Sequence, residues 1–125
     1  MYTALVLTQA SQTRLLAVFR DIIPVDWTIY CHHMTINMGN VASGPLVNSN
    51  FQLGENATVT AIGYACDQKV MAVSVESNIP SVNKQKHITI AVNHKEGGKP
   101  FYSNKLTNWE SITPLILHGT IEEVQ

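Results

Sequence analysis

Apolar residues in the first part of the chain change from strand to helix periodicity. Residues 2–7 (YTALVL) form a short run of β-branched, aromatic and other apolar side chains, which predicts a strand. The next segment has apolar residues at helical spacing, namely Leu15, Leu16, Val18 and Phe19. Thr8 or Ser11 can cap this helix, and Pro24 ends the segment. The chain is therefore expected to begin with a strand followed by a helix.

Polar turns divide the rest of the chain into further strands. They are expected at residues 27–38, 58–66, 70–77, 87–92 and 114–124. The second and third of these flank the short turn DQK and are typical of a hairpin. Residues 39–57 hold three Gly, one Pro and four Asn, so we expect a loop there, with an edge strand near Leu46 or Phe51.

The predicted order of elements indicates an α+β fold. The strands are short and mostly joined by turns, so antiparallel pairing should dominate, and one or two helices must cover one face of the sheet. The 125 residues suffice for one domain with one core, which we expect to span residues 1–125. A hydrophobic share of 45% and a charged share of 14% are typical of a compact soluble chain.

Charge, hydropathy and cysteine content narrow the classes of function. The net charge of −1 provides no overall field for nucleic acid or a membrane surface. The apolar runs are too short to cross a bilayer, and the first residues lack the pattern of a signal peptide. Cys31 and Cys66 alone do not make a disulfide framework. We therefore expect a cytoplasmic protein without membrane partners.

The tetrapeptide pattern His-x-Thr-Ile occurs twice, as HMTI at 33–36 and HITI at 87–90. Because side chains alternate along a strand, one face of the first strand should carry His33, Thr35 and Asn37. The same face of the second strand should carry His87, Thr89, Ala91 and Asn93. Such polar rows must meet solvent, a partner or a ligand. His32 is expected on the apolar side of its strand, in a structural role.

Two facing imidazoles with two hydroxyl groups form a chemically coherent set. One neutral imidazole can accept a proton from an attacking oxygen while the other, protonated, donates one to the leaving oxygen. Thr35 and Thr89 can donate hydrogen bonds to the non-bridging oxygens of a phosphate. This scheme needs neither a metal nor a cofactor. Which of His33 and His87 acts as base, and which as acid, stays open.

The segments HMTI and HITI resemble the paired signature of the 2H phosphoesterase superfamily. That group includes LigT-like RNA phosphodiesterases and phage (anti-CBASS) enzymes that cut cyclic nucleotide immune signals. The resemblance implies two pseudo-symmetric antiparallel β lobes around a central cleft, with one or two helices outside. It also implies a metal-independent phosphodiesterase with catalytic residues His33, Thr35, His87 and Thr89. The implied substrate is a nucleotide, a cyclic oligonucleotide or an RNA-type phosphodiester.

Residues near the second motif could bind such a substrate. Residues 80–105 contain five lysines and one acidic residue, Glu96, and are therefore locally positive. The lysines are Lys84, Lys86, Lys95, Lys99 and Lys105. Of these, Lys84 is a candidate for phosphate binding. Tyr102 is preferred for stacking on a base over Phe101, Tyr30 and Trp109. Asn37 and Asn93 could contact sugar or base. The small chain favours a small ligand over a long duplex, and the oligomeric state stays open.

Four other interpretations remain. A metal site could use His32, His33 and His87, although paired cysteines and an HExxH pattern are missing. A catalytic Cys31 beside His32 is disfavoured because adjacent residues of a strand point to opposite faces. The chain could also bind and sequester a nucleotide without cutting it. Finally, it could process 2′,3′-cyclic phosphates at RNA ends.

Overall fold

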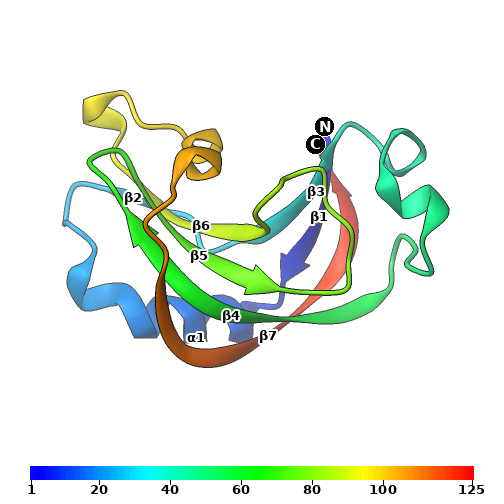
Figure 1. Cartoon of the computed structure of the whole chain (residues 1–125), viewed down its shortest axis with the longest axis horizontal. Helices are drawn as coiled ribbons and strands as arrows, with labels where there is room; N and C mark the ends of the chain where they lie inside the picture. The colour runs from blue at the N-terminus through cyan, green and yellow to red at the C-terminus, as the bar shows by residue number, and fades with distance from the viewer.

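The computed structural model describes residues 1–125, and its main feature is an antiparallel sheet that curves until it closes (Figure 1). The strands are β1 (Tyr2–Leu7), β2 (Thr28–Ile29), β3 (His33–Met38), β4 (Asn56–Cys66), β5 (Val70–Glu76), β6 (His87–Val92) and β7 (Glu110–Val124). Their order is β2-β6-β3-β1-β7-β4-β5, and β5 also pairs with β6. This last pairing closes the sheet, with β2 and β3 lying on the same side of β6.

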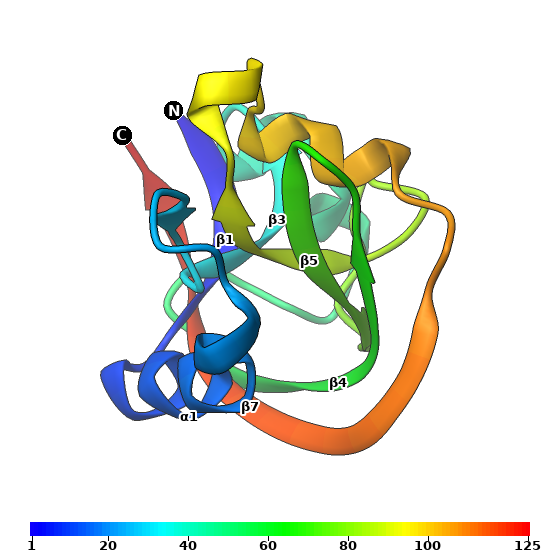
Figure 2. The ribbon, with the colours of Figure 1, turned by 90° about the vertical axis from the view of Figure 1, so that its left-hand side faces the viewer.

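One α-helix and five short 3₁₀ turns complete the fold. The α-helix, α1 (Gln9–Phe19), begins where the Thr8 side chain accepts a hydrogen bond from the Ser11 amide at 3.1 Å. The 3₁₀ turns are η1 (Arg20–Ile22), η2 (Val41–Ser43), η3 (Pro45–Asn48), η4 (His94–Glu96) and η5 (Pro100–Lys105). Helix α1 packs on β7 and β1 (Figure 2), whereas η5 packs on β5 and β6. No helix has the length and hydropathy needed to cross a membrane.

The expected antiparallel pairing is confirmed, and a mostly β fold with one main helix is compatible with the expected α+β class, while several details differ. The strands form one closed sheet, and the expected pseudo-symmetry of two lobes stays a prediction. The strand expected at 27–38 is interrupted and becomes β2 and β3. The edge strand expected near Leu46 or Phe51 is wrong, because Leu46 lies in the turn η3 and Phe51 lies outside any strand. The last strand begins four residues earlier than expected, at Glu110.

The core lies inside the closed sheet and fixes the orientation of both motif strands. A cluster of 19 buried residues draws side chains from every strand except β2, and it includes Leu15 and Phe19 of α1. The apolar members of the two motifs all belong to it and have no exposed surface, namely Met34, Ile36, Ile88 and Ile90. Burying each such side chain stabilises the fold by about 1.5–3 kcal/mol. The motif histidines and threonines are thereby held facing away from the core.

Candidate active site

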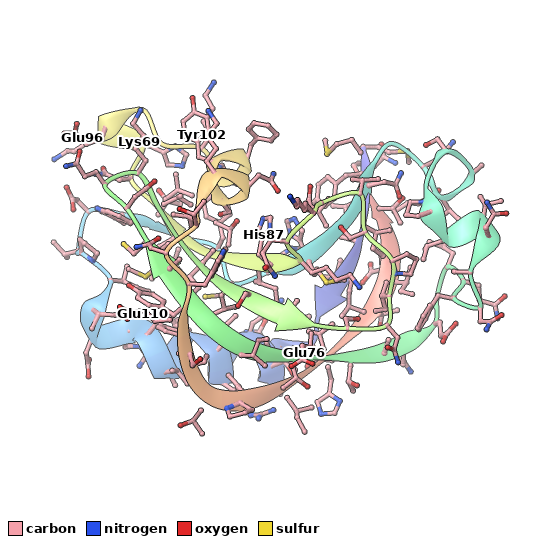
Figure 3. The ribbon with its side chains drawn as sticks, viewed as in Figure 1. Lys69, Glu76, His87, Glu96, Tyr102 and Glu110 are labelled. Carbon is pink, nitrogen blue, oxygen red and sulfur yellow. The ribbon has the colours of Figure 1, made fainter.

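All four motif residues line one cavity of about 420 Å³. Its lining consists of Tyr2, Tyr30, His32, His33, Thr35, Met38, Val82, Asn83, His87, Thr89, Pro100, Phe101 and Asn104. Figure 3 shows His87 near the middle of the molecule, beside the turn that carries Tyr102. The cavity has the size of a small-ligand site. The structure thus brings His33, Thr35, His87 and Thr89 together, although the motifs lie far apart in the sequence.

The contact between β3 and β6 explains this convergence. Met34 pairs with Ile88, and this pair points into the core. His33 and Thr35 flank the first of these residues, and His87 and Thr89 flank the second. Because neighbouring side chains in a strand point to opposite faces, the four polar side chains share the face away from the core.

Relative to β6, the chain has two extra residues where β3 begins, namely His32 and His33, although His33 itself pairs with Val6 of β1. The Cys31 amide donates to the Thr89 carbonyl at 3.0 Å, and Met34 pairs with Ile88. The chain therefore places two residues, His32 and His33, opposite a single step of β6. Cys31 adopts a positive φ of 48°, which is uncommon for a residue with a side chain, and this redirects the backbone. The expectation that His32 faces the apolar side is wrong, because the insertion turns both rings into the cavity.

A β-bulge at the last residue of each motif changes which of the following side chains face the cavity. Thr3 pairs with Asn37 and Ala4 with Thr35, which leaves Ile36 as an extra residue of β3. In the same way, Met71 pairs with Ala91 and Ala72 with Thr89, which leaves Ile90 as an extra residue of β6. Each bulge lies three residues after the motif histidine. The strict alternation expected from the sequence therefore ends at each bulge.

The bulges place Asn37 and Asn93 away from the cavity. Asn37 is buried, and its Nδ2 donates to the carbonyl groups of Met38 and Asn40, each at 3.0 Å. Met38 lines the cavity in its stead. The Nδ2 of Asn93 donates to the Gln68 carbonyl at 3.1 Å, in the turn between β4 and β5. Both amides thus hold backbone in place and are not positioned to contact a ligand in the cavity.

Lys84 and Tyr102 also lie outside the cavity lining. Lys84 borders a separate, open, polar pocket of about 490 Å³ together with Lys86 and Glu76. The Tyr102 ring has two ammonium groups near it, with Lys69 Nζ 5.5 Å and Lys105 Nζ 4.7 Å from its centroid. Figure 3 shows Lys69 and Tyr102 on the same side of the molecule. The side chain next to Tyr102, Phe101, faces the cavity instead.

Several lining residues carry no motif that would single them out in the sequence. Tyr2, Met38, Val82, Pro100 and Asn104 reach the cavity from four different segments of the chain. A signal appears only in three dimensions, because Met38, Val82 and Phe101 are large apolar side chains with 72%, 61% and 66% of their surface exposed. All three also line the cavity, and we call this set of exposed apolar side chains the rim.

Burial and neighbouring imidazoles control the protonation of His33. The pKa of His33 is lowered to about 4, mainly by burial and further by the nearby charges of His32 and His87. The Tyr2 ring lies against it, with ring centroids 4.8 Å apart. On its other side, His33 Nδ1 lies 3.0 Å from His32 Nδ1. His33 is therefore neutral at pH 7 in the free protein.

His87 has a different partner. Its Nδ1 lies 2.8 Å from the Gln85 carbonyl oxygen, which can only accept, so Nδ1 carries the proton. This leaves Nε2 as the nitrogen that can exchange protons with a ligand. Burial lowers the pKa of His87, and the Gln85 carbonyl opposes this effect because it stabilises the charged ring.

The two motif threonines are tied to different loops. The Thr89 hydroxyl is 2.8 Å from the hydroxyl of the buried Ser103 and donates at 3.4 Å to the Pro100 carbonyl, both in η5. The backbone carbonyl of Thr35 accepts a hydrogen bond from Ser81 Oγ at 2.8 Å. Next to it, the Val82 amide donates to the Ile36 carbonyl at 2.8 Å. These bonds attach the β5–β6 loop to β3, and the loop forms one wall of the cavity.

The cavity lining contains no lysine, arginine, aspartate or glutamate. A bound phosphate would therefore find its opposite charge on an imidazolium, and its remaining partners would be hydroxyl, amide and ring N–H groups. Three histidines line the cavity, but the protein has no group of three or more His, Cys, Asp or Glu side chains placed to hold a metal ion.

Comparison with known proteins identifies the family. The family model described as the fungal tRNA ligase phosphodiesterase domain matches residues 23–123, which include both motifs. Comparisons with curated proteins and with solved structures returned no significant match. The match covers most of the chain, so the chain belongs to this family of 2H-type phosphodiesterases, which are enzymes with nucleotide or RNA-type substrates.

Proposed function

We propose that the chain is a single-domain, metal-independent enzyme that opens 2′,3′-cyclic phosphates at RNA ends through its two His-x-Thr motifs. The observation that carries this proposal is the presence of His33, Thr35, His87 and Thr89 around one cavity. A volume of about 420 Å³ suits one nucleotide better than a long duplex. The family description, which refers to tRNA ligase, favours an RNA end over other phosphodiesters.

His33 is the proposed general base and His87 the proposed general acid. His33 is the more easily deprotonated ring, since its pKa is lowered to about 4. His87 is the better proton donor because the Gln85 carbonyl stabilises its charged form, and a bound anionic phosphate adds to this effect. Water attacks phosphorus and gives its proton to His33, while the bond from phosphorus to the departing ribose oxygen breaks. That oxygen takes a proton from His87.

The threonine hydroxyls have the second role. Thr35 and Thr89 donate to the non-bridging oxygens of the phosphate, where negative charge gathers in the transition state. If Ser103 donates to the Thr89 oxygen, the Thr89 proton is free to turn from the Pro100 carbonyl, 3.4 Å away, to a bound phosphate. No side chain in this scheme has to form a covalent intermediate, so the attacking oxygen comes from water or from the substrate.

A second candidate substrate is a cyclic oligonucleotide. Phage enzymes of the 2H superfamily cut immune signals of this chemical type. The rim supports it, because Met38, Val82 and Phe101 offer exposed apolar surface to bases beside the cleaved linkage. In a 3′,5′-linked substrate the neighbouring 2′-hydroxyl is the best-placed nucleophile, since it is tethered next to phosphorus. A 2′-deoxy substitution at that position should then block cleavage without preventing binding.

The test is product analysis over a panel of substrates. The panel contains nucleoside 2′,3′-cyclic phosphates, RNA with a 2′,3′-cyclic phosphate end, and cyclic di- and trinucleotides, each with and without EDTA. We expect the RNA-type cyclic phosphates to open at a rate that EDTA leaves unchanged. Preference for a cyclic oligonucleotide would move the proposal to the second substrate. Loss of activity with EDTA that zinc restores would overturn the metal-independent scheme.

Variants of the histidines test the assignment of the site. His33→Ala and His87→Ala should each lower kcat by about 10²–10⁴-fold, as expected for a lost general base or acid. The matched control is His118→Ala, which removes an exposed imidazole of β7 outside the cavity lining. Binding of the substrate without product from the wild-type protein at high concentration would show a nucleotide-binding protein instead of an enzyme.

A further inference from the structure

We propose that His32 is a positioning residue whose Nδ1 accepts a hydrogen bond from the Nδ1–H group of His33. This bond leaves Nε2 of His33 for the substrate. This inference rests on the proposed function, because it assigns a role beside the proposed general base. His32 is adjacent to the motif but not part of it, and alternation along a strand would have placed it in the core. The two-residue insertion after Cys31 brings its ring into the cavity lining instead.

The contact between the two rings requires that one Nδ1 atom is protonated and the other is not. The Nδ1 atoms of His32 and His33 lie 3.0 Å apart, which is hydrogen-bonding distance for two nitrogens. Two lone pairs would repel at this distance, so one nitrogen carries the proton and the other accepts it. The rings meet edge to face, with an interplanar angle of 81° and centroids 5.2 Å apart. The insertion thus holds each imidazole in a defined orientation relative to the other.

His87 shows which of the two arrangements serves catalysis. The Gln85 carbonyl holds the proton of His87 on Nδ1 and leaves Nε2 facing the cavity. If His33 is to accept a proton through Nε2, its own proton must likewise sit on Nδ1. His32 Nδ1 is then the acceptor, and the neutral His32 ring carries its proton on Nε2. Each of the two motif histidines thus has an acceptor at Nδ1, which is a backbone carbonyl for one and an imidazole for the other.

His32 Nδ1 is the hydrogen-bond partner that the structure gives His33 Nδ1. The titratable side chains facing this space are Tyr2 from β1, Tyr30 from the segment after β2, His33 from β3 and His87 from β6. Outside the lining, His94 Nε2 lies 3.1 Å from the Tyr30 hydroxyl. No carboxylate lines the cavity. A proton on His32 Nδ1 would leave no acceptor there, so the proposal requires the lone pair of His32 Nδ1 to face His33.

The experiment compares two substitutions of His32 with a control. His32→Asn places an amide oxygen close to the position of Nδ1, so it keeps an acceptor that does not titrate. His32→Ala removes the acceptor. We expect His32→Ala to lower kcat by about 10- to 100-fold with little change in KM, the range of one hydrogen bond to a group that becomes charged. His32→Asn should recover most of kcat, and His118→Ala should match the wild type.

A second measurement needs no substrate. Proton–nitrogen correlation spectra of protein labelled with ¹⁵N-histidine report the tautomer of each ring. We expect the His33 proton on Nδ1 in the wild type and in His32→Asn, and a shift towards the Nε2–H tautomer in His32→Ala. An Nε2–H tautomer of His33 in the wild type, or the same tautomer and kcat in all three proteins, would overturn the proposal. A wild type with the expected tautomer but no activity on any substrate would refute the proposed function and leave the positioning role of His32 standing.

Discussion

Thr35 and Thr89 occupy equivalent positions of the two motifs but have different surroundings. The Thr89 hydroxyl contacts Ser103 and Pro100, whereas Thr35 is bonded to the β5–β6 loop through its backbone carbonyl. If both hydroxyls hold the phosphate in the transition state, replacing either with the isosteric valine removes one donor without changing the volume. The expected loss is about 10²-fold in kcat, with a smaller effect on KM.

Steady-state kinetics of Thr35→Val and Thr89→Val, with Thr113→Val of β7 as the control, check this prediction. Thr113 is exposed and does not line the cavity. Unchanged kcat in both motif variants would mean that other donors hold the phosphate. An effect on KM alone would show that the hydroxyls bind substrate and transition state equally well.

Burial of neutral His33 makes the stability of the protein depend on pH. The pKa of this ring falls from 6.5 in the unfolded chain to about 4 in the folded protein. Between these values the unfolded chain binds more protons, so the stabilisation is complete above about pH 6.5 and is lost as the pH falls towards 4. The difference corresponds to roughly 3 kcal/mol in the free energy of unfolding. His87, whose pKa is also lowered, acts in the same direction.

Urea unfolding at a series of pH values measures this effect. The comparison between the wild type and His33→Gln isolates His33, because the carboxylates titrate alike in both proteins. We expect the wild-type free energy of unfolding to fall more steeply than that of the variant between pH 6.5 and 4. Parallel curves would contradict a buried, neutral His33.

At the scale of elements, periodicity predicted where strands lie better than which way their side chains point. The pattern HITIAV predicted β6 with its observed bounds, because an uninterrupted apolar alternation is a strong strand signal. The same alternation correctly placed His33 with Thr35 and His87 with Thr89. It failed at His32, which lies in the insertion, and at Asn37 and Asn93, which follow a bulge. Such irregularities depend on pairing with strands distant in sequence, so local periodicity contains no sign of them.

Because of the bulge at Ile36, the Asn37 side chain packs against the loop that follows β3. The Asn37 amide bonds backbone carbonyls, and a Cβ added at Gly44 would overlap its side chain. Gly44→Ala should therefore lower the free energy of unfolding by about 1–3 kcal/mol, because the added methyl group has no room. In the background of Asn37→Ala the same substitution should cost much less, since the clashing side chain is gone.

Urea unfolding of the two single variants and the double variant forms the double-mutant cycle that measures this coupling. Kinetics of Asn37→Ala provide the matching functional control. We expect kcat/KM per folded molecule to equal that of the wild type. Additive stability effects would contradict the predicted steric coupling between Gly44 and Asn37. A raised KM in Asn37→Ala would indicate that Asn37 contributes to substrate binding.

At the scale of the whole molecule, closure of the sheet brings together two motifs that are 54 residues apart. Strand β6 pairs with β3 on one side and β5 on the other, so the cavity lies where the ring of strands closes. The β5–β6 loop crosses to β3 and contributes Val82 and Asn83 to the cavity. The lysines that make residues 80–105 locally positive lie outside this lining.

The two chain ends lie side by side, since Tyr2 of β1 pairs with Val124 of β7 (Figure 2). A short glycine-rich linker can therefore join residue 125 to residue 1, and the chain can be reopened elsewhere. Opening it between Thr107 and Asn108, which are exposed, turns β7 and β1 into a hairpin and leaves every cavity segment intact. We expect this permutant to fold and to retain most of the wild-type kcat.

Opening between Val82 and Asn83 instead cuts a wall of the cavity next to two hydrogen bonds that attach the loop to β3. That permutant should keep its circular dichroism spectrum but lose most of its activity. Equal activity of the two folded permutants would show that the β5–β6 loop plays no part in holding the substrate.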